Sequence, residues 1–362
     1  MVTLLGEFMR EHYNTTDSGL MFILALIMPS IFVLVLSPII KAIFPNMSET
    51  ASYYVLLTLN QIGFFLTFFV YNKKRKINMW QECKVKANLN VLQIIIIIAL
   101  GLIAMFGFSS LVNYMEWGLS KIGYTYEAFN FLDLSNFGML IVNIILVALL
   151  PAICEELVFR GTILNGLKKF GPRLMMVLCG LLFAIMHLNI EQSIYQFVLG
   201  MVLAGVVLVT GSILSSMILH FFNNALVLVM SFITPQTEEA LTWAPTCAWD
   251  HIQPFLFAII SLAIIFGLIL ALQKCSKNGE YKLFNFKKQS KQTLNANIDI
   301  VNEQAEMLDV TQDSQDALQQ SQPSELNGTT ANKKNLSDIV LWISIGFGVI
   351  LWIATILGQI LK

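Results

Sequence analysis

The sequence FGMLIVNIILVALLPAICEELVFRG, residues 137–161, decides how this chain folds. Its first part, residues 137–153, is almost entirely apolar and predicts a membrane-spanning helix. The helix then continues into Glu155, Glu156 and Arg160. An ionisable side chain at the bilayer centre costs about 2.5–3.5 kcal/mol on insertion scales, so such residues usually mark a functional site. We therefore expect the rest of the chain to bring partners to this segment.

The composition predicts the same environment for the whole chain. Of the 362 residues, 56% are hydrophobic and only 12% are charged, and the mean hydropathy is +0.70. Soluble domains carry about 25% charged residues, so we expect an integral protein of the lipid bilayer and no nucleic-acid partner. The five cysteines are scattered and form no Cys-x-x-Cys pair, which argues against a disulfide framework or a cysteine-rich metal site.

Runs of about 20 apolar residues predict an all-α, polytopic membrane helix bundle with eight core spans and a ninth span at the C-terminus. The predicted spans are 19–38, 51–71, 90–112, 137–153, 174–187, 194–209, 213–233, 254–272 and 339–360. They divide the chain into an N-terminal segment (1–18), spans one to three with an outer loop (19–134), a core that carries the charged motif (135–232), an outer loop with span eight (233–275), a linker (276–337) and a C-terminal anchor (338–362).

The basic residues follow spans two, four and eight, which predicts the orientation of the chain. The loops on the opposite side are 39–50, 113–136 and 234–253. Their only basic residues are Lys41 and Lys121. Because Lys and Arg are concentrated in cytoplasmic loops, the N-terminus is predicted to be cytoplasmic. The basic residues in question are Lys73, Lys74, Arg75, Lys76, Lys84 and Lys86, then Lys168, Lys169 and Arg173, and finally Lys274, Lys277, Lys282, Lys287 and Lys288.

The linker differs from the rest of the chain in composition. Residues 291–335 contain no aromatic residue and are rich in Gln, Asn, Ser and Asp. Such a segment buries too little apolar surface to offset the entropy of ordering, so we predict a disordered cytoplasmic linker over 276–337. The last span would then hang from it as a detached anchor.

Two histidines fall inside predicted spans and belong to the same candidate site. Glu155 lies 16 residues before Gly171 and His187 lies 16 residues after it. If the two spans form an antiparallel hairpin around Gly171, both side chains lie about 24 Å from the turn, at 1.5 Å per residue. His220 lies nine residues past Gly211, in a later span. We therefore expect the three side chains to converge.

Spacing within the motifs separates their roles. Glu156 and Arg160 are four residues apart on one helix face, where opposite charges can pair and fix the helix. Glu155 points about 100° away and is assigned to the chemistry. A purely structural Glu–Arg pair would leave Glu155 unexplained. His220 and Asn224 also share a face and could donate hydrogen bonds to an oxyanion, although an interhelical hydrogen bond is the alternative role for Asn224.

These groups could support direct attack of water on an amide without a covalent nucleophile. The carboxylate would take a proton, a histidine would orient the water, and the remaining donors would bind the oxyanion. Zinc is the rival, since one Glu and two His match a zinc ligand set by type. The chain contains no His-Glu-x-x-His, however, which would be the strong zinc signal. Residue types alone leave both possibilities open.

The chain resembles the CPBP family of intramembrane proteases, which includes the type II CAAX prenyl endopeptidases and the bacterial Abi proteins. The resemblance covers residues 135–232. It implies that Glu155 and His187 activate water, that His220 and Asn224 form the oxyanion site, and that the site opens towards the cytoplasm. It also implies a glutamate-dependent mechanism without a cofactor, with zinc as the less favoured alternative. Three ordered motifs carry the resemblance: Glu155-Glu156-x-x-x-Arg160, Phe183-x-x-x-His187 and His220-x-x-x-Asn224.

The resemblance implies an endopeptidase that cuts a membrane-embedded or lipid-tethered peptide. Eukaryotic members cut after a prenylated cysteine, whereas bacterial members are linked to leader-peptide, pheromone or bacteriocin processing and to self-immunity. The compact loops favour a bacterial cell membrane. A non-enzymatic scaffold or bacteriocin-immunity protein that binds a peptide is the alternative, and a transporter ranks last because no inverted repeat is visible. The sequence carries no signal for an oligomeric state.

Overall fold

The computed structural model describes residues 12–83, 85, 89–124, 132–234, 243–276, 279, 281–284 and 328–361, and in the last helix it describes the side chains from residue 338 on. Every regular element within these ranges is helical, so the predicted all-α membrane bundle is confirmed. The chain divides into two units, Met1–Leu283 with Ser337–Lys362, and Phe284–Leu336. The candidate site lies in the first unit.

Nine helical segments of the described chain are long and apolar enough to cross a membrane, as predicted. The fourth, Phe137–Gly166, is a composite of α6 (Phe137–Asn143), η1 (Ile144–Leu149), α7 (Leu150–Glu156), η2 (Leu157–Ile163) and α8 (Leu164–Gly166). The others are α2 (Thr15–Ile43), α3 (Glu49–Arg75), α5 (Val91–Ser120), α9 (Gly171–Met186) preceded by η3 (Lys168–Phe170), α10 (Ile190–Thr210), α11 (Ile213–Ile233), α12 (Ala248–Cys275) and α14 (Gly328–Ile360), while α4 (Met79–Glu82) is short.

Polar side chains fix where the helices begin. The Asn189 side chain accepts from the backbone N–H groups of Glu191 and Gln192 at the start of α10, and Ser212 accepts from Leu214 at the start of α11. These caps satisfy amides that have no partner within the helix. They explain why α10 begins four residues before the predicted span: Asn189, and not the first long apolar run, starts the helix.

The basic residues gather at one end of the first unit, where α2 and α9 begin. We call this the basic end and define it by Lys73, Lys74, Lys76, Lys168 and Lys169. A buried ion pair joins α2 to α3 there.

In this ion pair, Arg75 Nε and Nη2 donate to Asp17 Oδ1 and Oδ2 at 2.7 and 2.9 Å. The Tyr71 hydroxyl also donates to Asp17 Oδ1, at 2.6 Å. A buried charge pair needs such additional hydrogen bonds to offset its desolvation. The first two spans are therefore fixed to each other beside the charged motif.

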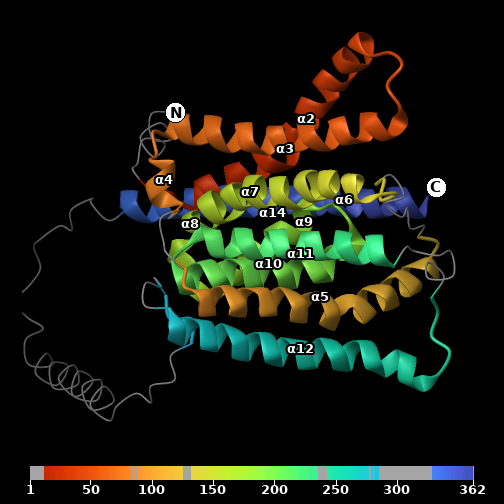
Figure 1. Cartoon of the computed structure of the whole chain (residues 1–362). Helices are drawn as coiled ribbons and strands as arrows, with labels where there is room; N and C mark the ends of the chain where they lie inside the picture. The colour runs from red at the N-terminus through yellow and green to blue at the C-terminus, as the bar shows by residue number, and fades with distance from the viewer. Residues whose placement is uncertain are drawn as a thin grey trace, which may run out of the picture. The chain divides into compact units, whose positions relative to one another are not determined.

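Close helix pairs form the interior of the unit. The broadest contacts join α9 to α10, α5 to α12 and α2 to α3, and Figure 1 shows α5 and α12 running alongside each other. The helices α9 and α10 meet backbone to backbone at two glycines. A Cβ atom added to Gly200 would lie 2.9 Å from the Gly180 Cα, so a side chain at this position would push the helices apart.

The start of the predicted linker is folded, which corrects the prediction of disorder there. The Leu283 side chain is buried, and its carbonyl accepts from Arg173 Nε at 3.1 Å. The Tyr281 amide donates to the Leu208 carbonyl at 3.3 Å. One buried apolar side chain, one hydrogen bond from the Arg173 side chain and one backbone hydrogen bond thus hold residues 281–283 against α9 and α10. The remaining part of the predicted linker, 285–327, lies outside the described residues.

The last span is packed against the bundle, which corrects the expectation that it is detached. The helix α14 begins at Gly328, ten residues before the predicted anchor. A Cβ atom added to Gly19 of α2 would lie 2.9 Å from the Leu341 Cα of α14, so the two helices touch closely. Asp338 pairs with Lys169 and accepts from the Thr15 hydroxyl. The sequence missed this packing because an apolar helix carries little information about its neighbours in lipid.

Candidate functional site

The fourth span departs from α-helical geometry on both sides of the charged motif. The segments η1 and η2 are π-helical, and the short helix α7 between them carries Glu155 and Glu156. Pro151 has no N–H to donate to the Val147 carbonyl four residues earlier. Isolated π turns within α-helices are frequent at functional sites. The local backbone therefore singles out the segment that the charges had already indicated.

The predicted ion pair between Glu156 and Arg160 is present, and it also includes a histidine. Arg160 Nη1 donates to Glu156 Oε1 at 2.8 Å. His220 Nδ1 of α11 lies 2.8 Å from the same oxygen. All three side chains are buried, with exposures of 0% for Glu156, 1% for Arg160 and 3% for His220. Glu156 therefore binds span four to span seven.

Arg160 is held from several sides. Its Nη2 donates to the Gly200 carbonyl of α10 at 3.0 Å. Its guanidinium carbon lies 4.7 Å from the centre of the Phe183 ring and 5.7 Å from that of Phe159. A cation over an aromatic face gains electrostatic attraction, more so when both groups are desolvated. Arg160 thus joins spans four, five and six, in agreement with a structural role.

Glu155 is directed away from this ion pair. Its Oε1 accepts from Gln61 Nε2 of α3 at 3.4 Å. The side chain is 8% exposed, so it is nearly enclosed but not sealed. Glu155 is therefore free of the structural ion pair, and its approach to His187, expected from the equal spacing about Gly171, stays a prediction.

Hydrogen bonds fix the protonated nitrogen in both membrane histidines. His187 Nδ1 lies 2.7 Å from the Phe183 carbonyl. Because a carbonyl can only accept, Nδ1 carries the proton and the neutral ring presents Nε2 as an acceptor. His220 Nδ1 faces the Glu156 carboxylate in the same way. With Nδ1 bonded to the carboxylate, Nε2 is the ring nitrogen left for other partners.

The Phe183 ring holds these groups together. It meets the rings of Phe159, His187 and His220 edge to face, with centroids 5.1, 4.7 and 5.8 Å away. Such pairs position rings more closely than burial alone does. Phe183 begins the second motif, and its contacts account for the presence of an aromatic residue there.

Asn224 belongs to a chain of hydrogen bonds that the sequence did not reveal. The Tyr195 hydroxyl of α10 donates to Asn223 Oδ1. Asn223 Nδ2 in turn donates to Asn224 Oδ1 at 3.2 Å. Asn224 Nδ2 then donates to the Val147 carbonyl at 3.1 Å. This last contact is the interhelical hydrogen bond considered above as the alternative role for Asn224. An amide nitrogen has two hydrogens, so one donor remains for an oxyanion.

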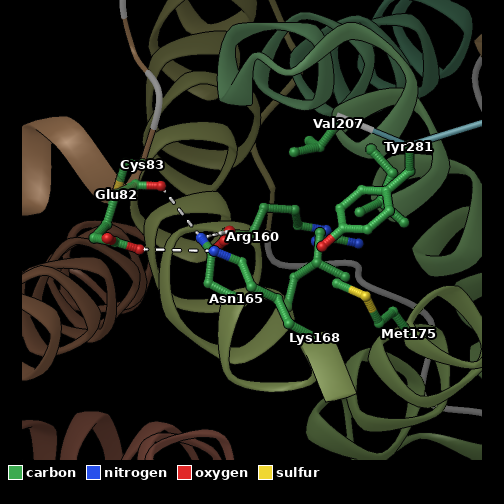
Figure 2. Close-up of a pocket in the computed structure, with 10 residues that line it drawn as sticks. Glu82, Cys83, Arg160, Asn165, Lys168, Met175, Val207 and Tyr281 are labelled. Atoms are coloured by element: carbon green, nitrogen blue, oxygen red, sulfur yellow. Dashed lines mark hydrogen bonds and ion pairs between the residues drawn. The ribbon is translucent and has the colours of Figure 1, made fainter. Parts of the chain in front are cut away.

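Side chains of α2 and α8 hold the carbonyls of η2 at the basic end. The Ser18 hydroxyl of α2 donates to the Ile163 carbonyl at 2.8 Å. Asn165 Nδ2 lies 3.0 Å from the Gly161 carbonyl and 3.2 Å from that of Arg160. Figure 2 shows Asn165 between the backbone carbonyls of Arg160 and Glu82. These contacts compensate for the altered backbone hydrogen bonding of a π turn.

Two cavities in the described part of the chain lie outside the carboxylate–histidine cluster. One, drawn in Figure 2, has a volume of about 10 Å³ and is lined by Arg160 and Tyr281 among others. It has room for about one water molecule. The other, of about 450 Å³, lies between the end of α2 and the start of α3. Neither is lined by Glu155 or His187, so the implied opening towards the cytoplasm stays a prediction.

The comparison with known families decides how this cluster is understood. Residues 137–226 match the model of a family described as type II CAAX prenyl endopeptidase Rce1-like. Over this segment the chain is similar to the type II CAAX prenyl endopeptidases, in agreement with the CPBP resemblance of its three motifs. The match covers about a quarter of the chain and includes all three motifs. Neither the curated proteins nor the solved structures contain a match.

This similarity indicates the coarse activity. The family implies intramembrane proteolysis, and the nine apolar helices of the described residues establish an integral membrane protein. Helices α2, α3, α5, α12 and α14 lie outside the matched segment. Two of them, α2 and α3, nevertheless supply Ser18 and Gln61 to the CPBP motif.

Sequence reasoning missed several residues that complete the CPBP site. Gln61 and Tyr195 each carry a polar group within an apolar span, and this was the available signal. The closeness of Gly200 to Arg160 left no signal in the sequence. Among the described residues, no three His, Cys, Asp or Glu side chains converge closely enough to hold a metal ion.

Proposed function

We propose that the chain is an intramembrane endopeptidase in which Glu155 and His187 activate water. One observation carries this proposal: Glu155 stands apart from the Glu156–Arg160–His220 cluster and accepts a hydrogen bond from Gln61 instead. A buried carboxylate outside the structural ion pair is costly to keep in a membrane, which favours a chemical role. The neutral His187 ring presents a lone pair at Nε2, which suits it to orient a water molecule.

In the proposed reaction, Glu155 takes a proton from water while the water oxygen attacks the carbonyl carbon of the peptide bond. The protonated His220 and the free amide hydrogen of Asn224 donate to the oxyanion that forms. The carbon–nitrogen bond then breaks, and Glu155 returns its proton to the leaving amine. Glu156 and Arg160 hold His220 in place but exchange no proton with the substrate.

The proposed substrate is a membrane-embedded or lipid-tethered peptide, and the proposed mechanism needs no metal ion. The test is cleavage of a library of membrane peptides by the purified protein in detergent. We expect cleavage by the wild type that a chelator leaves unchanged. Loss on chelation with recovery on zinc addition would replace the metal-free mechanism. No cleavage of any peptide, together with tight binding of one, would favour the scaffold or immunity protein.

We also propose a bacterial cell membrane with a cytoplasmic N-terminus, and the native cysteines can test this orientation. Cys247 is exposed between α11 and α12, whereas Cys275 lies where α12 ends, next to the basic end. A membrane-impermeant maleimide should therefore label Cys247 in intact cells, and the Cys247→Ser variant should lose this signal. Labelling of Cys275 in intact cells, with Cys247 protected until permeabilisation, would reverse the orientation.

Cys83 serves as the internal control in the same experiment. Burial raises its pKa to about 12, with the neighbouring Glu82 adding to the effect. At pH 8 only about one thiol in ten thousand would then be the reactive thiolate. Cys83 should stay unlabelled on both sides of the membrane until the protein unfolds.

A further inference from the structure

The helix α14 runs beside α9 and is attached near both ends of it. At the basic end, Asp338 pairs with Lys169, just before α9 begins. At the other end, the Thr355 hydroxyl donates to the Leu188 carbonyl at 3.0 Å, just after α9 ends. The two α14 residues are 17 positions apart, about 25 Å of helix. Figure 1 shows α14 alongside the bundle helices of this unit.

Tight packing joins α14 to the bundle between these two contacts. A Cβ atom added to Gly348 would lie 2.9 Å from Ile185 Cγ2 and 2.8 Å from a ring carbon of Phe22. Helices approach this closely in membranes where a residue has no side chain. This contact at Ile185, two residues before His187, therefore fixes the position of α14 along α9.

The turn after His187 has a strained backbone. Leu188 has a φ of +48°, a left-handed conformation that a branched residue rarely adopts. Such a residue persists only where its surroundings hold it. It separates His187, the residue that ends α9, from Asn189, which caps α10. A change in this turn would therefore move the His187 ring.

Trp352 of α14 is linked to this turn by two successive hydrogen bonds through Ser193. Its indole Nε1 donates to the Ser193 hydroxyl at 3.0 Å. That hydroxyl donates in turn to the Asn189 carbonyl at 2.5 Å. The Thr355 hydroxyl has one proton, and it lies 2.7 Å from the Trp352 carbonyl as well as 3.0 Å from that of Leu188. Trp352 therefore contributes more to the turn than Thr355 does.

We propose that α14 positions His187 by holding the Leu188–Asn189 turn, and that Trp352 is the positioning residue. The helix lies outside the segment that the family model matches. The inference rests on the proposed function only in that His187 orients the attacking water. The hold on the turn itself can be measured without any substrate.

The first test is hydrogen exchange of the amides from His187 to Glu191 in the full-length protein. Trp352→Phe keeps an aromatic ring but removes the indole N–H. We expect these amides to exchange about 5- to 10-fold faster, the effect of losing one hydrogen bond. Trp342→Phe is the matched control, because Trp342 is 53% exposed on the same helix. Equal exchange in both variants would overturn the proposal.

The second test is kinetic and uses a peptide that the wild type cleaves. Trp352→Phe should lower kcat about 3- to 10-fold and leave KM unchanged, because the substrate still binds while His187 is misplaced. Thr355→Val should cause a smaller decrease that Thr355→Ser avoids. Unchanged kcat alongside faster exchange would remove the link to His187. If the wild type cleaves nothing, the proposed function fails, while the exchange result still decides whether α14 holds the turn.

Discussion

Replacing Glu155 by Gln should lower kcat by about 10²- to 10⁴-fold, the range for loss of a general acid or base. The amide has the size of the carboxyl group but cannot take a proton from water. KM should change little, because the substituted atom acts on water and not on the bound peptide. Steady-state cleavage of the library peptide by purified wild type and variant, measured over a range of peptide concentrations, gives both constants.

The stability of this variant separates a chemical role from a structural one. Glu155 accepts one long hydrogen bond from Gln61 and takes no part in the buried ion pair. Its replacement should therefore leave the thermal unfolding temperature unchanged or slightly higher, since a nearly enclosed charge is removed. Glu116→Gln, at a half-buried carboxylate near the end of α5, is the matched control and should stay active. A Glu155→Gln protein with more than a third of the wild-type kcat would refute the assignment.

Replacing Arg160 by Met should destabilise the fold, in contrast to the replacement of Glu155 by Gln. The substitution leaves Glu156 buried without its guanidinium partner and removes the hydrogen bond to the Gly200 carbonyl. Breaking a buried pair by removing one partner costs about 3–5 kcal/mol. Denaturant titration in mixed micelles should show this loss in the free energy of unfolding. Activity would fall as well, because His220 depends on the same Glu156 oxygen.

Three further variants test whether the cluster acts as a unit. Arg160→Lys keeps the charge but loses the planar fork that serves Glu156 and Gly200 together, so we expect it to recover only part of the loss. Glu156→Gln combined with Arg160→Met should cost less than the sum of the two single changes. Arg173→Met is the matched control, because Arg173 is exposed and its Nε donates to the Leu283 carbonyl outside the buried cluster. If Arg173→Met lowered the free energy of unfolding as much as Arg160→Met does, the buried cluster would contribute no more to stability than a contact at the surface.

The sequence alone predicted the features that depend on local geometry. The count of nine spans follows from the length of apolar helix that a bilayer requires. The pairing of Glu156 with Arg160 follows from their spacing of four residues. The division of the chain into functional domains and the roles of the site residues stay predictions.

Only the tertiary structure decided which helices meet around the motif. It places His220 on Glu156, directs the Asn224 amide to the Val147 carbonyl, and brings Gln61 and Tyr195 into the site. It also packs α14 against the turn that follows His187. Rise and spacing are properties of one helix and can be counted along the chain. The rotation and neighbours of apolar helices in lipid depend on side-chain packing between segments far apart in sequence, which no local pattern records.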